Sequence, residues 1–129
     1  IDLDINCTAD HNEIVKDRTA WDVYAMANVQ CPTGDPQYWF TVFALTDAAR
    51  NDGQYSNPDL DALGQEMATS FDADKRAELA LKMQQEVLDD NAFVYCAFLK
   101  MSMISQANVK NYTSHACDYY QVTADLDIE

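Results

Sequence analysis

The sequence predicts an α/β fold in which strands and helices alternate along the chain. Two observations predict it: apolar and polar residues alternate near both ends, and helix-start signals followed by helically spaced apolar residues lie between them. The 129 residues are about the length of one domain, and 48% of them are hydrophobic, which is enough for a buried core. Strands separated by helices favour parallel pairing, and we treat residues 1–129 as a single domain.

The first part of the chain predicts two strands and one or two short helices. Residues 1–7 alternate apolar and polar side chains, and residues 22–29 form a β-branched, apolar run, so we expect both to be strands. Residues 11–20 are expected to form a short helix, and residues 37–45 fit another, although their aromatic content leaves that assignment open. A chain that begins inside a strand, without an initiator Met, is typical of a piece cut from a longer protein.

The strongest helix-start signal comes near the middle of the chain. Asn57 is expected to be the N-cap, Pro58 to take the first helical position, and Asp59 to lie at the positive end of the helix dipole. The buried face that the spacing predicts consists of Leu60, Leu63, Met67 and Phe71.

A second long helix and the remaining strands follow. The helix is expected to start at Asp72 or Asp74 and to run to about Leu88. Residues 93–104 are typical of a buried strand or strand pair, and residues 119–128 alternate as a last strand. The predicted buried face of the helix consists of Ala77, Ala80, Leu81, Val87 and Leu88.

The charge of the chain excludes partners that require a basic surface. There are 22 acidic and 8 basic residues, giving a formal net charge of −14. Nucleic acids and anionic membranes are bound through clustered basic side chains, so neither is expected as a partner. The longest apolar run, residues 92–101, is far shorter than the ~20 residues of a membrane helix. We interpret the acidity as a source of solubility.

The cysteines and histidines give little support to an enzyme or a metal protein. The four cysteines are too far apart for a CxxC redox or zinc pattern. Cys96 is expected to be a buried core thiol, and Cys31–Cys117 is the first candidate for a disulfide in an oxidising compartment. His115 with Cys117 would be half a metal site, and His11 has no spaced partner on a helix face. No metal, cofactor or catalytic residue is therefore expected.

The polar loop that follows the second strand is the candidate binding site. In open α/β sheets, ligands bind beyond the carboxyl ends of parallel strands, where residues 30–35 would lie. Alternatively, the loop is only a corner: Trp39 packs beneath it, and Asp35 caps the segment that begins at Pro36. The candidate ligand-binding residues are Asn28, Val29, Gln30, Cys31, Thr33, Asp35 and Trp39.

Two motifs carry a resemblance to a known family. Residues 55–61 read Tyr-Ser-Asn-Pro-Asp-Leu-Asp, and Asp72, Arg76, Leu79 and Gln84 have the spacing D-x-x-x-R-x-x-L-x-x-x-x-Q. In this order they resemble the C-terminal part of the family 5 extracytoplasmic solute-binding proteins, the peptide- and nickel-type receptors of ABC importers. The resemblance covers nearly all of the chain.

The resemblance implies the C-terminal lobe of a type II periplasmic-binding-protein fold, with residues 1–129 covering most of the second ligand-binding lobe. It implies a non-enzymatic, substrate-binding component that captures a peptide, nickel, a metal chelate or a related small solute in a cleft between two lobes. The implied partners are ABC permease subunits and the first lobe of the same chain. The implied location is extracytoplasmic, either periplasmic or lipid-anchored at the cell surface. The alternatives are a diverged domain used for solute sensing or signalling, and a thiol- or metal-dependent enzyme.

The loop departs from the patterns of both ligand classes. Peptide-binding members commonly place an Asp three residues before the Asp-Pro pair, where it binds the peptide amino group, and here that position is Pro32. The loop Trp and Tyr of the nickel receptor correspond by the same count to Gln30 and Gly34. We therefore expect that free peptide amino termini are not strongly selected.

Overall fold

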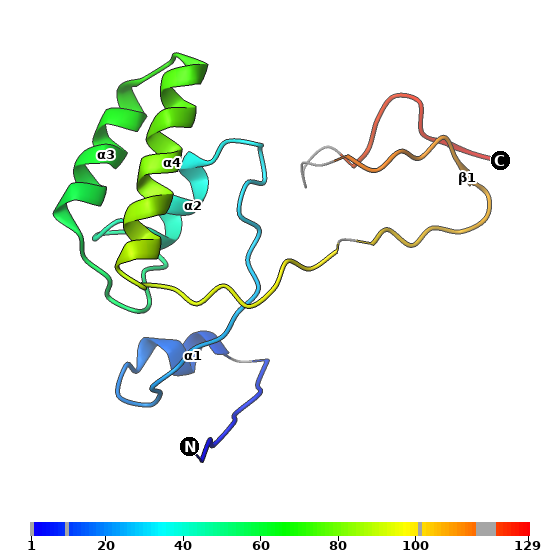
Figure 1. Cartoon of the computed structure of the whole chain (residues 1–129). Helices are drawn as coiled ribbons and strands as arrows, with labels where there is room; N and C mark the ends of the chain where they lie inside the picture. Colours follow the sequence, from blue (N-terminus) through cyan, green and yellow to red (C-terminus); the bar gives the residue numbers. More distant parts are fainter. Residues whose placement is uncertain (1, 10, 101, 116–120) are drawn as a thin grey trace.

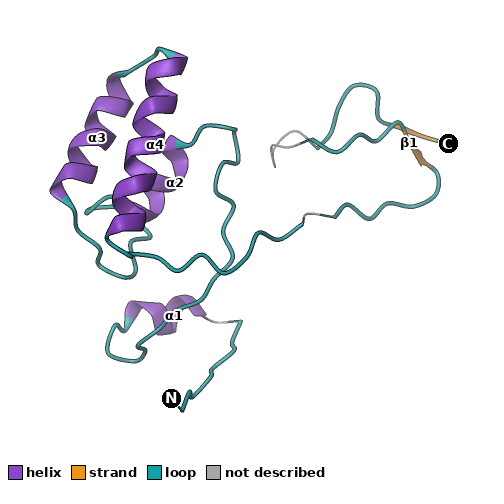
Figure 2. Cartoon of the chain, viewed as in Figure 1, coloured by secondary structure: helices purple, strands orange, loops and turns teal. Residues whose placement is uncertain are grey.

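The computed structural model describes residues 2–9, 11–100, 102–115 and 121–129. Its centre is a group of helices formed by residues 37–89, and the chain on either side is mostly extended (Figure 1). The N-terminal side carries one short helix, α1 (His11–Lys16), and the C-terminal side carries the strands β1 (Val109–Lys110) and β2 (Asp127–Ile128). Helices therefore account for most of the regular structure (Figure 2).

Helix α3 (Pro58–Thr69) begins where the sequence predicts. The side-chain oxygen of the N-cap Asn57 accepts hydrogen bonds from the backbone N–H groups of Asp59 and Leu60, at 2.9 and 3.0 Å. Pro58 takes the first helical position, where a backbone N–H would have no helical partner. The predicted start is confirmed.

Helix α4 (Ala73–Asp89) also begins at a predicted cap. The Asp72 carboxylate accepts a hydrogen bond of 2.8 Å from the backbone N–H of Lys75. The helix ends before Asn91, which has the left-handed φ of 52° that favours Asn and Gly. Both predicted ends of this helix are confirmed.

The aromatic segment before α3 is helical. Helix α2 (Gln37–Trp39) continues directly into the π-helix η1 (Phe40–Ala44), which buries Phe40 and Phe43. The backbone N–H of Leu45 closes the last turn by bonding the carbonyl of Phe40 at 3.0 Å. The helical assignment of residues 37–45 is thus confirmed, with a π turn that its sequence does not signal.

The hydrophobic core lies where α2, η1, α3 and α4 meet. Gly64 faces Leu45 so closely that an added Cβ would stand 2.9 Å from a Leu45 methyl carbon, and this glycine therefore brings α3 close to the end of η1. The core residues are Phe40, Ala44, Leu60, Met67, Leu79, Ala80, Met83 and Val87.

The predicted buried faces of the two long helices are only partly correct. Phe71 is 94% exposed, and Leu81 and Leu88 on α4 are 67% and 52% exposed. Helix α4 carries two apolar stripes, and the one that meets α3 and η1 contains Leu79 and Met83 instead of Leu81 and Leu88. The prediction combined residues from both stripes.

The predicted strands are wrong for most of their length. Residues 2–7, 22–29 and 93–100 are extended but belong to no strand in the described part of the chain. A strand exists only when a neighbouring strand takes up its N–H and C=O groups, and these runs have no such neighbour among the described residues. The pairing that does occur is antiparallel, with Val109 opposite Ile128, whereas parallel pairing was expected.

Two further predictions need correction. Helix α1 ends at Lys16, not at residue 20, because a turn follows in which Asp17 accepts hydrogen bonds from the backbone and hydroxyl of Thr19, at 3.1 and 2.7 Å. Cys96 is exposed, because no described element covers the extended run that contains it. Cys117 lies outside the described residues, so the Cys31–Cys117 disulfide stays a prediction.

Candidate functional site

The candidate loop lies on the surface between an extended segment and α2. The turn is closed by a hydrogen bond of 3.0 Å from the backbone N–H of Gly34 to the carbonyl of Cys31. Gly34 itself has a φ of 83°, a backbone conformation that favours glycine. Pro32 is buried, so the turn packs against the rest of the molecule at this residue. The exposed candidates are Asn28, Val29, Gln30, Cys31 and Thr33, while Asp35 and Trp39 are half-buried.

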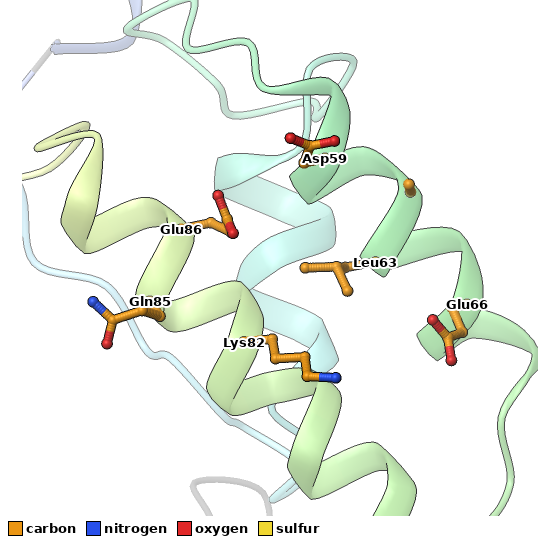
Figure 3. Close-up of a pocket in the computed structure, with 7 residues that line it drawn as sticks. Asp59, Leu63, Glu66, Lys82, Gln85 and Glu86 are labelled. Atoms are coloured by element: carbon orange, nitrogen blue, oxygen red, sulfur yellow. The ribbon is translucent and has the colours of Figure 1, made fainter.

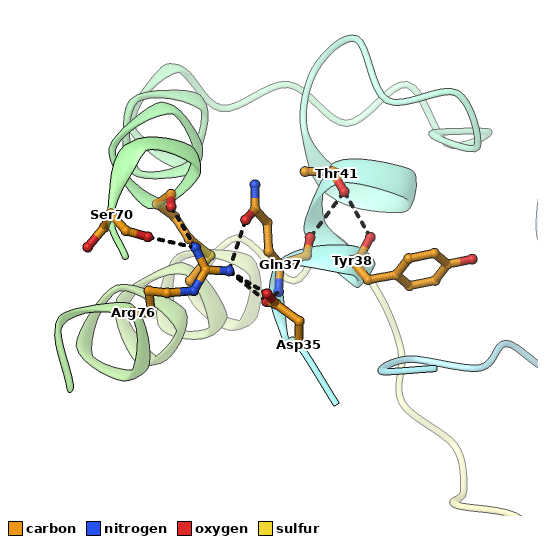
Figure 4. Close-up of polar contacts among 7 residues, drawn as sticks. Asp35, Gln37, Tyr38, Thr41, Ser70 and Arg76 are labelled. Atoms are coloured by element: carbon orange, nitrogen blue, oxygen red, sulfur yellow. Dashed lines mark hydrogen bonds and ion pairs between the residues drawn. The ribbon is translucent and has the colours of Figure 1, made fainter. Parts of the chain in front are cut away.

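Asp35 joins the loop to the helices. One carboxylate oxygen accepts a hydrogen bond of 2.9 Å from the backbone N–H of Gln37, so the expected role as a cap is confirmed. The Arg76 guanidinium donates to both carboxylate oxygens, at 2.8 and 2.6 Å (Figure 4). Ligand contact by Asp35 remains a prediction. A ligand at this carboxylate would share it with Gln37 and Arg76.

The local charges affect the ionisation of Asp35. Partial burial acts to raise the pKa of this carboxyl, but the Gln37 hydrogen bond together with the hydrogen bond and positive charge of Arg76 outweigh it. The net effect holds the pKa of Asp35 below its ordinary value. The group is therefore an anion at neutral pH.

Arg76 is the important residue that the sequence interpretation did not place at this site. It comes from the first turns of α4, and its backbone N–H bonds the carbonyl of Asp72 at 2.9 Å. A cation near the positive end of a helix dipole is unfavourable unless it has a specific anionic partner. The place of Arg76 in the D-x-x-x-R motif is the sequence feature that indicates a specific role for this arginine.

Trp39 packs among aromatic side chains. Its ring meets Phe40 and Phe93 edge-on, with centroids 5.3 and 5.2 Å apart, and lies 6.2 Å from the ring of Tyr95. Phe93 and Tyr95 follow α4, so the cluster connects α2 with the extended segment 93–100. The alternative that Trp39 is a packing residue has direct contacts in its favour, and a ligand contact stays a prediction.

Two hollows lie on the helices, away from the loop. The larger, about 460 Å³, is a groove between α3 and α4 (Figure 3). The smaller, about 270 Å³, lies between the end of η1 and α3. Neither is lined by any of residues 28–39, so the predicted site residues do not form either hollow. The larger is lined by Asp59, Ala62, Leu63, Glu66, Lys82, Gln85 and Glu86, and the smaller by Thr41, Leu45, Asp47, Ala48, Asp61 and Gln65.

The described part of the chain contains neither a cluster of metal-ligating side chains nor a membrane-spanning helix. No three His, Cys, Asp or Glu side chains gather there closely enough to hold a metal ion. The ring of His11 stacks on Tyr24, with centroids 6.4 Å apart. None of the described helices is both long and apolar enough to span a membrane.

Comparison with known proteins shows which proteins the chain is similar to. The chain is 29% identical over 112 residues to the nickel-binding protein NikA of Staphylococcus aureus strain NCTC 8325, a match that covers 87% of this chain and 23% of that protein. A crystal structure of NikA from Staphylococcus aureus in complex with Ni(L-His)2 superposes with a TM-score of 0.76 at 25% identity, over 98% of this chain and 27% of that one. The resemblance to the family 5 solute-binding proteins is confirmed. No protein-family model matches the sequence.

The same comparison confirms the type II periplasmic-binding-protein fold. The chain spans about a quarter of the length of the relatives that it matches. Its extent within the second lobe of a family 5 protein stays a prediction.

The first family motif, residues 55–61, is structural in this chain. Asp61 accepts hydrogen bonds of 2.9 and 2.6 Å from the backbone and hydroxyl of Thr46, which ties η1 to α3. The Asp90 carboxylate accepts hydrogen bonds of 2.7 Å from both the Tyr55 hydroxyl and the Asn57 amide. Partial burial and the hydrogen bond to Asp90 raise the pKa of Tyr55 to about 12. This family 5 motif therefore joins the start of α3 to the end of α4.

Proposed function

We propose that this chain is part of the substrate-binding component of an ABC importer, which captures a small solute in a cleft between two lobes and does not change it chemically. The solute class is a nickel complex, another metal chelate or a peptide. The proposed partners are the permease subunits of the importer and the first lobe of the same protein. The proposed location is extracytoplasmic, either periplasmic or lipid-anchored at the cell surface.

One observation carries this proposal: nearly the whole chain matches a nickel-binding protein in both sequence and structure. The match extends from the extended N-terminal side through the helices to the C-terminal side, since it covers 98% of the chain. A shared helix pair alone would support only a shared fold. Agreement over the mostly extended segments supports a shared architecture of the lobe, and hence a shared way of binding.

The proposed contribution of this chain to the ligand site is the segment formed by residues 28–35, which we call the ligand loop. Its exposed side chains include the donors and acceptors of Asn28, Gln30 and Thr33. None of these three has a hydrogen bond in the helical core to maintain, and they are available to a solute. Val29, Cys31, Asp35 and Trp39 complete the proposed set.

The test is binding by the full-length protein. A thermal-shift screen against Ni(L-His)2, Ni²⁺ alone and a peptide library would identify the solute class, because a ligand at about 100 times its Kd stabilises the native state by roughly 2.7 kcal/mol. The absence of stabilisation by every one of these classes would contradict the proposal.

The loop itself is tested by a double variant, Gln30→Ala with Thr33→Ala. Its matched control is Gln84→Ala with Thr113→Ala, which removes the same two side-chain types from exposed positions outside the loop. The loop variant should bind the identified solute more weakly than the control, at an unchanged circular-dichroism spectrum. Equal affinities would show that the loop is only a corner.

A further inference from the structure

We propose that Arg76 is the positioning residue of the ligand loop: it fixes the conformation in which the loop meets the solute, without touching the solute itself. This inference rests on the proposed function, because it concerns the same loop. Arg76 lies on α4, 41 positions along the chain from Asp35, so the loop is held by an element that is remote in sequence.

One side of the guanidinium anchors Arg76 to α3. Its Nη1 donates hydrogen bonds to the backbone carbonyls of Met67 and Ser70, at 2.8 and 3.0 Å. These carbonyls lie at the end of α3, where the Met67 carbonyl also accepts the backbone N–H of the C-cap Ser70 at 3.2 Å. The Arg76 side chain is only 20% exposed, so these bonds are shielded from water. The bonds to α3 therefore fix the position of Arg76 independently of its contacts with the loop.

The other side of the guanidinium holds the loop. Its Nη2 donates to both oxygens of Asp35, at 2.8 and 2.6 Å, and lies 3.0 Å from the side-chain oxygen of Gln37 (Figure 4). The same carboxylate also accepts the backbone N–H of Gln37. Asp35, the last residue of the ligand loop, and Gln37, the first residue of α2, are thus fixed to the α3–α4 pair at one point.

The contact between Asp35 and Arg76 joins the ligand loop to α4, whereas the hydrogen bond that closes its turn is local. The bond between the backbone groups of Gly34 and Cys31 closes the turn but does not attach it to a helix. Preceding residues 22–30 are extended and pair with no strand in the described part of the chain. A loop that is held in one conformation before binding loses less conformational freedom when a solute binds, and this favours affinity.

Lysine cannot replace arginine here. The planar guanidinium presents donors in a fixed fork and reaches four acceptor groups from three segments, whereas an ammonium group is a single point charge. The Arg76→Lys variant keeps the charge and most of the length of the side chain. It therefore separates the geometry of the contact from its charge.

The experiment compares Arg76→Lys with Asp61→Ala in the full-length protein. Asp61→Ala is the stability control, because it removes the contact between α3 and Thr46 and leaves the loop contacts intact. Affinity for the preformed Ni(L-His)2 complex is measured by calorimetry, and hydrogen exchange is measured at the Gly34 and Gln37 amides. We expect Arg76→Lys to bind about tenfold more weakly than Asp61→Ala and to exchange faster at both amides. If Arg76→Lys fails to fold, Gln37→Ala takes its place, because it removes one acceptor of the Arg76 guanidinium at a residue outside the proposed ligand-binding set.

The outcomes separate this inference from the proposed function. Unchanged exchange at Gly34 and Gln37 in Arg76→Lys would overturn the inference whether or not Ni(L-His)2 binds. If the Gln30→Ala, Thr33→Ala double variant weakens binding while Arg76→Lys binds no more weakly than Asp61→Ala, the inference fails and the ligand loop stands. If the double variant binds like wild type, the loop assignment fails first.

Discussion

Apolar side chains are buried in the helical part of the chain, residues 37–89, and exposed in the extended segments on either side of it. In the helices, Leu79 and Met83 are fully buried. In the segment after α4, Val94 and Phe98 are 88% and 83% exposed. The difference lies in where each element finds its hydrogen-bond partners.

A helix satisfies its own backbone and needs other elements only to cover its apolar face. The caps at Asn57 and Asp72 are local side chains, so both long helices form and pack within this chain. A strand needs a neighbour for its backbone as well as for its side chains. The extended segments therefore keep their apolar side chains exposed, because no strand lies beside them in the described part of the chain.

The largest effect that would test this comparison is the loss of core packing in α4. Leu79→Ala in the full-length protein should lower the free energy of unfolding by about 3 kcal/mol, because it leaves a cavity between the helices. Leu81→Ala removes the same side chain from the exposed stripe of the same helix and should cost less than about 0.5 kcal/mol. Urea denaturation of the two variants checks the difference. Equal losses would mean that the outer stripe of α4 is covered in the full-length protein.

The next effect concerns binding. Residues 1–129 alone should bind the solute of the full-length protein at least about a hundredfold more weakly, a loss of roughly 2.7 kcal/mol, because a cleft ligand draws contacts from two lobes. Calorimetry with Ni(L-His)2 or the solute found in the screen measures both affinities. Equal affinities would contradict the two-lobe site and place the whole site within this chain.

The same comparison explains what the sequence could predict. Helix starts depend on residues within one turn of each other, and the predicted caps at Asn57 and Asp72 are correct. The buried stripe of α4 was harder to predict, because Leu81 and Leu88 repeat at helical spacing just as the core residues do. Only the positions of α3 and η1 decide which stripe is buried. The strands could be predicted as extended runs, but their partners are not in the described chain.

The candidate site shows the same limit. Turn residues such as Pro32 and Gly34 predicted the loop and its cap from local chemistry. The contact between Asp35 and Arg76 joins positions 41 apart, and only the packing of both α2 and α4 against α3 brings them together. The motif contained Arg76, but its spacing describes a helix and does not name the partner of the arginine.

A smaller effect is expected at the start of α3. Asn57→Ala should cost about 1 kcal/mol of stability, because the N-cap bonds to Asp59 and Leu60 are lost. Pro58→Ala should also act on stability alone. Neither residue belongs to the ligand loop, so affinity for the solute should not change. A variant with an unchanged melting temperature but an altered solute preference would place this end of α3 in the cleft.

The smallest expected effect is the pH dependence of the Asp35 contact. The folded pKa of Asp35 is lowered, so the carboxylate form stabilises the native state at pH values above the ordinary pKa of an aspartate, about 3.9. This contribution is lost as pH falls through the lower, folded pKa, because the unfolded state takes up its proton first. The Asp35→Asn variant has no carboxylate at this position and lacks this stabilisation at every pH. The difference in melting temperature between wild type and Asp35→Asn should therefore be largest near pH 7 and should shrink below about pH 4.

The matched control for this prediction is Asp125→Asn, which changes the net charge equally at an exposed position outside the helices. The side chain of Asp35 is itself 45% exposed, so solvent screening keeps the effect small, and it must be measured as a difference between variants over the same pH series. If the Asp35→Asn difference stays constant down to pH 3, Arg76 does not stabilise the carboxylate in the folded protein. The ligand loop would then be held to α2 by the backbone N–H groups of Gln37 and Tyr38, and the contact between Arg76 and the carboxylate would not contribute to its position.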